Sequence, residues 1–144
     1  MFSIEKSNII SELQSLSNVA DKKQTLPVLS NVLIRCNSDK VQLKSTDLEV
    51  ELEVTLTSPT ITKPAEITIP AKKISDIVKE LPEGPLSFEL NDDATKMVVK
   101  SSSGKYNLST IPAADFPDFD VEASENFYEV ESEGLLSLIG KTSF

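Results

Sequence analysis

The spacing of apolar residues changes early in the chain. Phe2 and Ile4 alternate with polar residues, as in a β-strand. The apolar residues that follow recur every three to four positions, as on one face of a helix: Ile9, Ile10, Leu13 and Leu16. Ser7 stands where an N-cap side chain would accept a hydrogen bond from the first helical turn. The opening therefore predicts a strand that runs directly into an amphipathic helix.

This opening occurs three times. Residues 127–143 match residues 1–17, with Tyr128 in the place of Phe2 and Val130 in the place of Ile4. Between these two copies, Ile67 and Ile69 alternate in the same way and precede a helical pattern. That second helix begins near Ala71 and ends before the turn residues 82–85, which hold two prolines and a glycine. Internal repetition of this kind indicates a duplicated supersecondary unit.

Extended segments separated by turn residues follow each of the first two helices. They lie at roughly 28–37, 40–46 and 48–57, and then at roughly 86–91, 96–101 and 105–111. The last of these reads as a strand from Tyr106 to Ile111 that enters a connector with two prolines. The pattern predicts an α+β fold of two βαβββ units, with mostly antiparallel sheets and both helices on one face.

The repeats also predict where the domains divide. Residues 1–122 form one domain, and residues 123–144 form a linker and the first strand and helix of a second domain. A helix at the very end would have no sheet against which to bury its apolar side. We therefore expect the chain to be a truncated part of a longer protein.

The composition is that of a water-soluble globular domain. Apolar residues make up 39% of the 144 residues and charged residues 26%, with a formal net charge of −9. No apolar run approaches the ~18 residues of a membrane helix, so no membrane partner is expected. The N-terminus lacks a signal-peptide layout. The single cysteine, Cys36, lies in an alternating apolar segment and fits a core thiol in a reducing, cytoplasmic setting.

The sequence offers little catalytic or metal-binding chemistry. It contains no histidine, and its four glycines form no phosphate-binding loop. Alternate carboxylates occur at Asp47, Glu49, Glu51 and Glu53, which in a strand would form a row on one face. A solvated outer sheet face explains that row better than a metal site, because metal ligands must converge on one point. We predict no catalytic residues, no metal and no cofactor.

Several local stretches resemble the bacterial DNA sliding clamp, the beta subunit of DNA polymerase III, in their order and spacing. They are Thr25-Leu26-Pro27-Val28-Leu29, Ser45-Thr46-Asp47-Leu48-Glu49, Ile69-Pro70-Ala71-Lys72-Lys73, Leu81-Pro82-Glu83-Gly84 and Leu108 to Pro117. Each stretch alone is weakly specific, but together they span nearly all of residues 1–122.

The resemblance implies a DNA-clamp fold and a non-catalytic function in DNA replication. A full-length chain of three domains would form a head-to-tail homodimer ring, with helices lining the hole and sheets on the outside. The ring would encircle double-stranded DNA without reading its sequence and tether the replicative polymerase as a processivity factor. The polymerase and the clamp loader would bind later domains that are absent from this chain.

The resemblance also implies DNA contacts, which the chain supplies with lysine and glutamine. The loop after the first helix carries Lys22, Lys23 and Gln24, and the second helix begins with Lys72. Family members often have arginine at these places; lysine keeps the charge and loses the bidentate fork. By composition alone, these lysines would be solvated surface residues.

A subunit interface is implied at the far edge of the domain, on the segments 96–101 and 105–110. Tyr106 and Leu108 would be its apolar anchors, and Lys73, Lys96 and Lys105 would face acidic residues of the partner. Ordinary core packing is the competing interpretation for Tyr106 and Leu108, because alternation places them on one face. The competing function is an antiparallel-sheet module that binds protein through a sheet edge, without nucleic acid.

Overall fold

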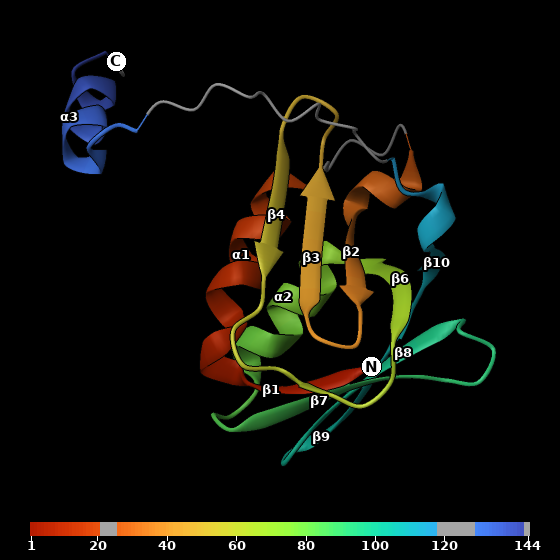
Figure 1. Ribbon diagram of the computed structural model, residues 1–144. Helices are drawn as coiled ribbons and strands as arrows, with labels where there is room; N and C mark the ends of the chain where they lie inside the picture. Colours follow the sequence, from red (N-terminus) through yellow and green to blue (C-terminus); the bar gives the residue numbers. More distant parts are fainter. Residues whose placement is uncertain (21–25, 118–128, 143–144) are drawn as a thin grey trace.

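The computed structural model describes residues 1–20, 26–117 and 129–142, and two antiparallel sheets form its body (Figure 1). We call them sheet A and sheet B. Sheet A has the strand order β5 (Thr60–Ile61), β1 (Phe2–Glu5), β7 (Pro85–Leu90), β8 (Lys96–Ser101) and β9 (Gly104–Ser109). Sheet B has the order β10 (Ile111–Pro112), β6 (Ala65–Pro70), β2 (Asn31–Cys36), β3 (Val41–Thr46) and β4 (Glu51–Thr55). The helices are α1 (Ile10–Val19), α2 (Ala71–Glu80) and α3 (Ser132–Thr142).

The two predicted units are present, and each gives its first strand to the sheet of the other. β1 opens the first unit but pairs with β7 of the second, with Phe2 opposite Phe88. β6 opens the second unit but pairs with β2 of the first, with Ile69 opposite Val32. Neither sheet can therefore form from one unit alone, and the two units make a single domain.

The core lies between the sheets and the paired helices α1 and α2, which lie side by side behind sheet B in Figure 1. Phe2 and Phe88 are both 1% exposed, and their rings stack with centroids 4.7 Å apart. Leu16 of α1 and Ile74 of α2 are fully buried. Each such side chain contributes roughly 1.5–3 kcal/mol by leaving water. The apolar helical stripes predicted from the sequence are confirmed.

The predicted N-cap at Ser7 is wrong. A 3₁₀ turn, Lys6–Asn8, stands between β1 and α1, so the residue at the N-cap of α1 is Ile9, which has no capping side chain. The Ile9 N–H donates to the Lys6 carbonyl at 3.1 Å within this turn. Ser7 itself donates to Asn8 Oδ1 at 3.4 Å, outside the helix. The tight turn therefore moves the helix start beyond the reach of Ser7.

The predicted carboxylate row is also wrong over half its length, because residues 47–50 form a turn and β4 begins only at Glu51. Asp47 Oδ1 accepts hydrogen bonds from the N–H groups of Glu49 at 3.0 Å and Val50 at 2.7 Å, which lower the pKa of Asp47. Leu48 consequently adopts a positive φ of 77°. A short polar side chain that binds its own backbone has replaced the expected strand with a hairpin turn.

The predicted strand from Tyr106 to Ile111 is two strands in different sheets. β9 ends at Ser109, and β10 pairs with β6 of sheet B, with Ile111 opposite Thr68. A 3₁₀ turn, Ala113–Asp115, follows. The predicted strand 28–37 is likewise shorter, because a 3₁₀ turn, Pro27–Ser30, precedes β2.

Two further predictions concern Cys36 and the third opening. Cys36 is 2% exposed, and burial raises the pKa of its thiol, as expected for a core position. The helix of the third opening is confirmed as α3. Its predicted strand is wrong over residues 129–131, which are described and form no strand, while residues 127 and 128 lie outside the described residues. The predicted boundary between residues 122 and 123 also lies outside them.

Candidate nucleic-acid and subunit interfaces

The exposed face of α2 carries the basic side chains of the helix pair. Lys72 is exposed at the first turn, and its ammonium lies 3.9 Å from the Asp76 carboxylate one turn later. The two side chains are 79% and 65% exposed. An exposed pair of this kind contributes little and is easily exchanged. Lys72 can therefore release Asp76 and meet another anion.

The exposed face of α1 is almost uncharged. Its solvent-facing side chains are neutral and polar: Ser11, Gln14, Ser15 and Asn18. Glu12 is the one charged residue of this helix and is half-buried. The helix pair thus combines a weakly basic helix with a neutral helix. Such a surface can approach a polyanion without binding it tightly.

Lys22, Lys23 and Gln24, the other predicted DNA contacts, lie outside the described residues. The segment that carries them, residues 21–25, connects the end of α1 to the 3₁₀ turn Pro27–Ser30.

β9 is the outermost strand of sheet A, and β8 lies next to it. The Thr110 N–H donates to the Thr95 carbonyl at 3.1 Å, which continues the ladder between these strands. Backbone groups alternate in direction along an antiparallel strand. The N–H and C=O groups of Lys105, Asn107 and Ser109 therefore point away from β8, toward the open side of the sheet. Of the two predicted interface strands, only β9 offers free backbone groups.

Four of the five predicted interface side chains lie on β8 and β9, where they are spread over both faces of the sheet, and the fifth lies on α2. Leu108 is 5% exposed, stands opposite Met97, and belongs to the core. Tyr106, on the same face, is 37% exposed. Lys96 and Lys105 are exposed on the opposite face of the sheet, and Lys73 is exposed on α2. The structure therefore places Leu108 in the core and Tyr106 at the margin of the edge.

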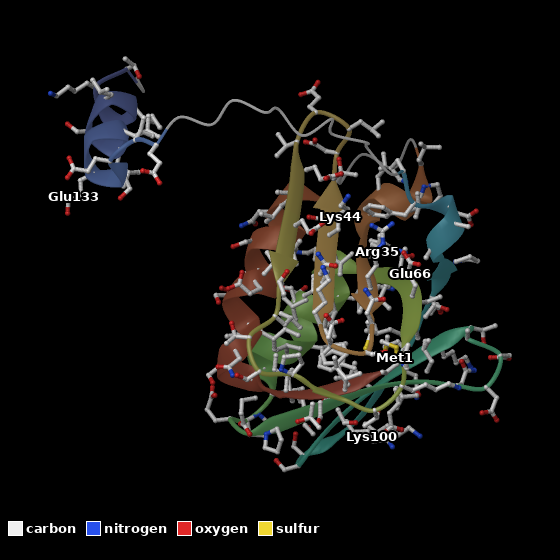
Figure 2. The ribbon with its side chains drawn as sticks, in the orientation of Figure 1. Met1, Arg35, Lys44, Glu66, Lys100 and Glu133 are labelled. Atoms are coloured by element: carbon white, nitrogen blue, oxygen red, sulfur yellow. The ribbon has the colours of Figure 1, made fainter. Side chains whose placement is uncertain are left out.

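The sequence reasoning missed one charged residue beside this edge. Lys100 stands opposite Lys105 in the strand register, and its ammonium lies 2.6 Å from the Glu89 carboxylate (Figure 2). This hydrogen bond, with a further one from Ser87, lowers the pKa of Glu89. The period-two spacing of Lys96, Val98 and Lys100 was the available signal.

Several carboxylates of sheet B pair with cations. Glu66 and Arg35 pair at 2.5 Å across β6 and β2, on the face of sheet B that is turned away from the helices (Figure 2). Glu51 and Glu53 lie 3.1 Å and 3.9 Å from the buried Lys44 ammonium. In the part of the chain that the structure describes, no group of three or more potential metal ligands occurs, and no helix is long and apolar enough to cross a membrane.

Two antiparallel sheets backed by a helix pair, with an open edge strand, are the architecture of the DNA-clamp class, as the match to solved sliding-clamp structures shows. Residues 1–120 match the family described as DNA polymerase III beta subunit, N-terminal domain. The chain belongs to this family, a class of non-catalytic sliding-clamp subunits.

Relatives and solved structures agree with this assignment. The chain is 40% identical to the beta sliding clamp of Pseudomonas putida over 99% of its own length and 39% of that relative. It is 35% identical to a beta sliding clamp sequence of Vibrio harveyi, covering 99% of this chain and 98% of that sequence. The crystal structure of the Pseudomonas aeruginosa beta subunit superposes with a TM-score of 0.89 at 34% identity, over 96% of this chain and 37% of that chain. The chain thus spans about two fifths of the length of the Pseudomonas relatives.

Proposed function

We propose that this chain is the first domain, residues 1–122, and the start of the second domain, residues 123–144, of a ring-shaped DNA polymerase processivity factor. The full-length protein forms a homodimer ring in the cytoplasm, encircles duplex DNA without reading its sequence, and tethers the replicative polymerase. Polymerase and clamp loader bind its later domains. The observation that carries this proposal is the superposition on a solved beta subunit at a TM-score of 0.89 over 96% of the chain.

The distribution of charge supports an enclosing ring more than a tight DNA-binding protein. The formal net charge of this chain is −9, which disfavours tight DNA binding by the chain as a whole. Lys72 and Lys73 stand on α2, whereas acidic residues such as Glu53 and Glu66 stand on the outer face of sheet B. A ring that must slide needs weak phosphate contacts and no base-edge contacts, because base contacts would hold it at particular sequences.

Topological linkage gives the test of this proposal. Once loaded on closed circular DNA, the full-length protein should stay bound through gel filtration in high salt, because leaving requires the ring to open. After a single restriction cut, it should slide off the ends within the time of the same filtration. The measurement is the fraction of labelled protein that co-elutes with DNA before and after the cut.

Nicked circular DNA is the matched control, since nicking releases supercoiling but leaves no ends. Equal retention on circular and linear DNA would contradict the proposal that the protein encircles DNA as a ring. Loss from both forms in high salt would favour the competing function, a protein-binding module that uses the open edge of β9.

The predicted DNA lysines should each contribute one phosphate contact. Replacing Lys23 or Lys72 of the full-length protein by alanine should weaken DNA association and reduce the slope of log K against log salt by about 0.9 per lost contact. Lys40→Ala is the matched control, because Lys40 is exposed in the β2–β3 turn, away from the helices. Fluorescence anisotropy with duplex DNA at several salt concentrations gives the slopes. A slope in either variant equal to that of Lys40→Ala would remove that lysine from the DNA contacts.

We place the subunit interface at β9, with Tyr106 at its margin and Lys73, Lys96 and Lys105 facing acidic residues of the partner. The open backbone side of β9 and the exposure of these four side chains support this assignment. Leu108 is 5% exposed, so it would contribute to the interface indirectly, by packing in the core and supporting β9.

A further inference from the structure

Residues 111–116 cross from the edge of sheet A onto the outer face of sheet B. Their backbone pairing is short: only Ile111 and Pro112 pair with β6, and proline has no N–H to donate. Two residue pairs would hold a chain segment only weakly. Side-chain contacts must therefore account for its fixed position.

The first of these contacts is a buried hydrogen-bond relay. Asn31 Nδ2 of β2 donates to Thr68 Oγ1 of β6 at 2.8 Å, and Thr68 Oγ1 donates to the Ile111 carbonyl at 2.9 Å. Asn31 is 3% exposed and Thr68 is fully buried. The Thr68 hydroxyl thus accepts one hydrogen bond and donates another. Breaking the relay would leave buried polar groups without partners, which is costly.

The second contact is a small apolar cluster that is separate from the main core. Phe116, 7% exposed, packs with Val28 and Leu33, and Ile111 and Ala113 lie at its margin. Leu33 alternates with Val32 and Ile34, which face the main core, so the cluster lies on the opposite face of sheet B. The Phe116 N–H also donates to the Ala113 carbonyl at 3.0 Å, which closes the 3₁₀ turn.

We propose that residues 111–116 form a docked joint that sets the direction in which the chain leaves this domain, with Phe116 and Thr68 as its positioning residues. This inference rests on the proposed function. Pro117, which follows the joint, is the last described residue before the connector. A ring closes only if successive domains meet at a defined angle. Loosening the joint would spread that angle and favour open rings.

Two full-length variants test the joint through ring lifetime. Phe116→Ala removes the apolar anchor, and Thr68→Val removes the hydroxyl at nearly constant volume. Each should shorten the residence of the ring on closed circular DNA by roughly tenfold, which is the effect of a tenfold larger population with an undocked joint. Phe116→Leu should restore most of the lifetime, and Asp115→Ala, an exposed change in the same turn, should leave it unchanged.

A distance measurement on the 144-residue chain tests docking directly. Spin labels at the exposed positions Asp39 and Ala114 report the distance from the β2–β3 turn to the joint by double electron–electron resonance. A chain without introduced cysteines measures background labelling at the buried Cys36. We expect one narrow distance distribution, which Phe116→Ala and Thr68→Val should broaden while circular dichroism shows the domain still folded.

The two arms separate failure of the joint from failure of the ring. A wild-type protein that leaves circular DNA contradicts the proposed function. The distance measurement then shows by itself whether residues 111–116 are docked. In a second outcome, the wild-type ring stays on circular DNA while both variants keep the same ring lifetime and the same narrow distance distribution. That result would refute the proposal that Phe116 and Thr68 hold a docked joint. Should either variant unfold, the other and Phe116→Leu supply the comparison.

Discussion

Replacing Asn107 by proline is expected to convert the full-length ring into monomers while its first domain stays folded. The Asn107 N–H points away from β8, so proline removes no hydrogen bond from the existing ladder, and edge strands tolerate proline for this reason. A partner strand that adds to β9 would lose that donor and meet the pyrrolidine ring. We expect the dimer dissociation constant to rise about a hundredfold, on the order of 3 kcal/mol.

Asn107→Ala is the matched control, because it changes the same side chain and keeps the backbone N–H. Sedimentation velocity over a range of concentrations should show dimers for the wild type and Asn107→Ala, and monomers for Asn107→Pro. Dimers of undiminished stability in Asn107→Pro would exclude strand addition at β9. Monomers in both variants would assign the interaction to the side chain instead of the strand edge.

Replacing Lys6 by methionine should lower the free energy of unfolding by about 2–4 kcal/mol, although the change is from a charged to an apolar side chain. Lys6 is 8% exposed, and its ammonium donates to the carbonyls of Leu81 at 2.6 Å and Lys79 at 3.1 Å. These carbonyls lie at the C-terminal end of α2, where helical partners are missing and the helix dipole is negative. Methionine would bury them without a donor.

The neighbouring Glu83 carboxylate lies 3.3 Å from the Lys6 ammonium, but its side chain is 76% exposed, so the carbonyls carry most of the expected effect. Lys79→Met is the matched control: it removes an exposed lysine from the same helix end. Urea unfolding of the 144-residue chain, followed by circular dichroism, gives both free energies. Equal losses in the two variants would show that Lys6 acts as an ordinary surface charge.

Some parts of the fold could be predicted because their pattern is local. The α2 helix follows from Ile74 and Val78 at helical spacing, from the strand before it, and from the prolines after it. The β3–β4 region shows the limit of this reasoning. Its alternation predicts a second strand from about residue 48, but Asp47 binds the N–H groups of Glu49 and Val50 and forms a turn, so β4 begins only at Glu51. Periodicity does not show which polar residue will bind its own backbone.

The candidate site divides in a similar way. The family motifs placed Lys72 correctly at the exposed first turn of α2 and pointed to the edge strand β9. They did not separate Leu108, which is buried, from Tyr106, which is partly exposed, because alternation gives both residues the same face. Exposure at a sheet edge depends on what covers each position, and that is a property of the packed domain.

The sequence by itself determined the duplicated βαβββ units, the apolar stripes of α1 and α2, and the family. These follow from short-range periodicity and from ordered local motifs. Only the tertiary structure decided that β1 and β6 exchange sheets, that the chain crosses between sheets after Ser109, and that Lys6 is buried against α2. The physical reason is that alternation specifies which face of a strand is buried but not which strand becomes its neighbour. That choice depends on contacts between residues far apart in the sequence, and these form only when both units pack together.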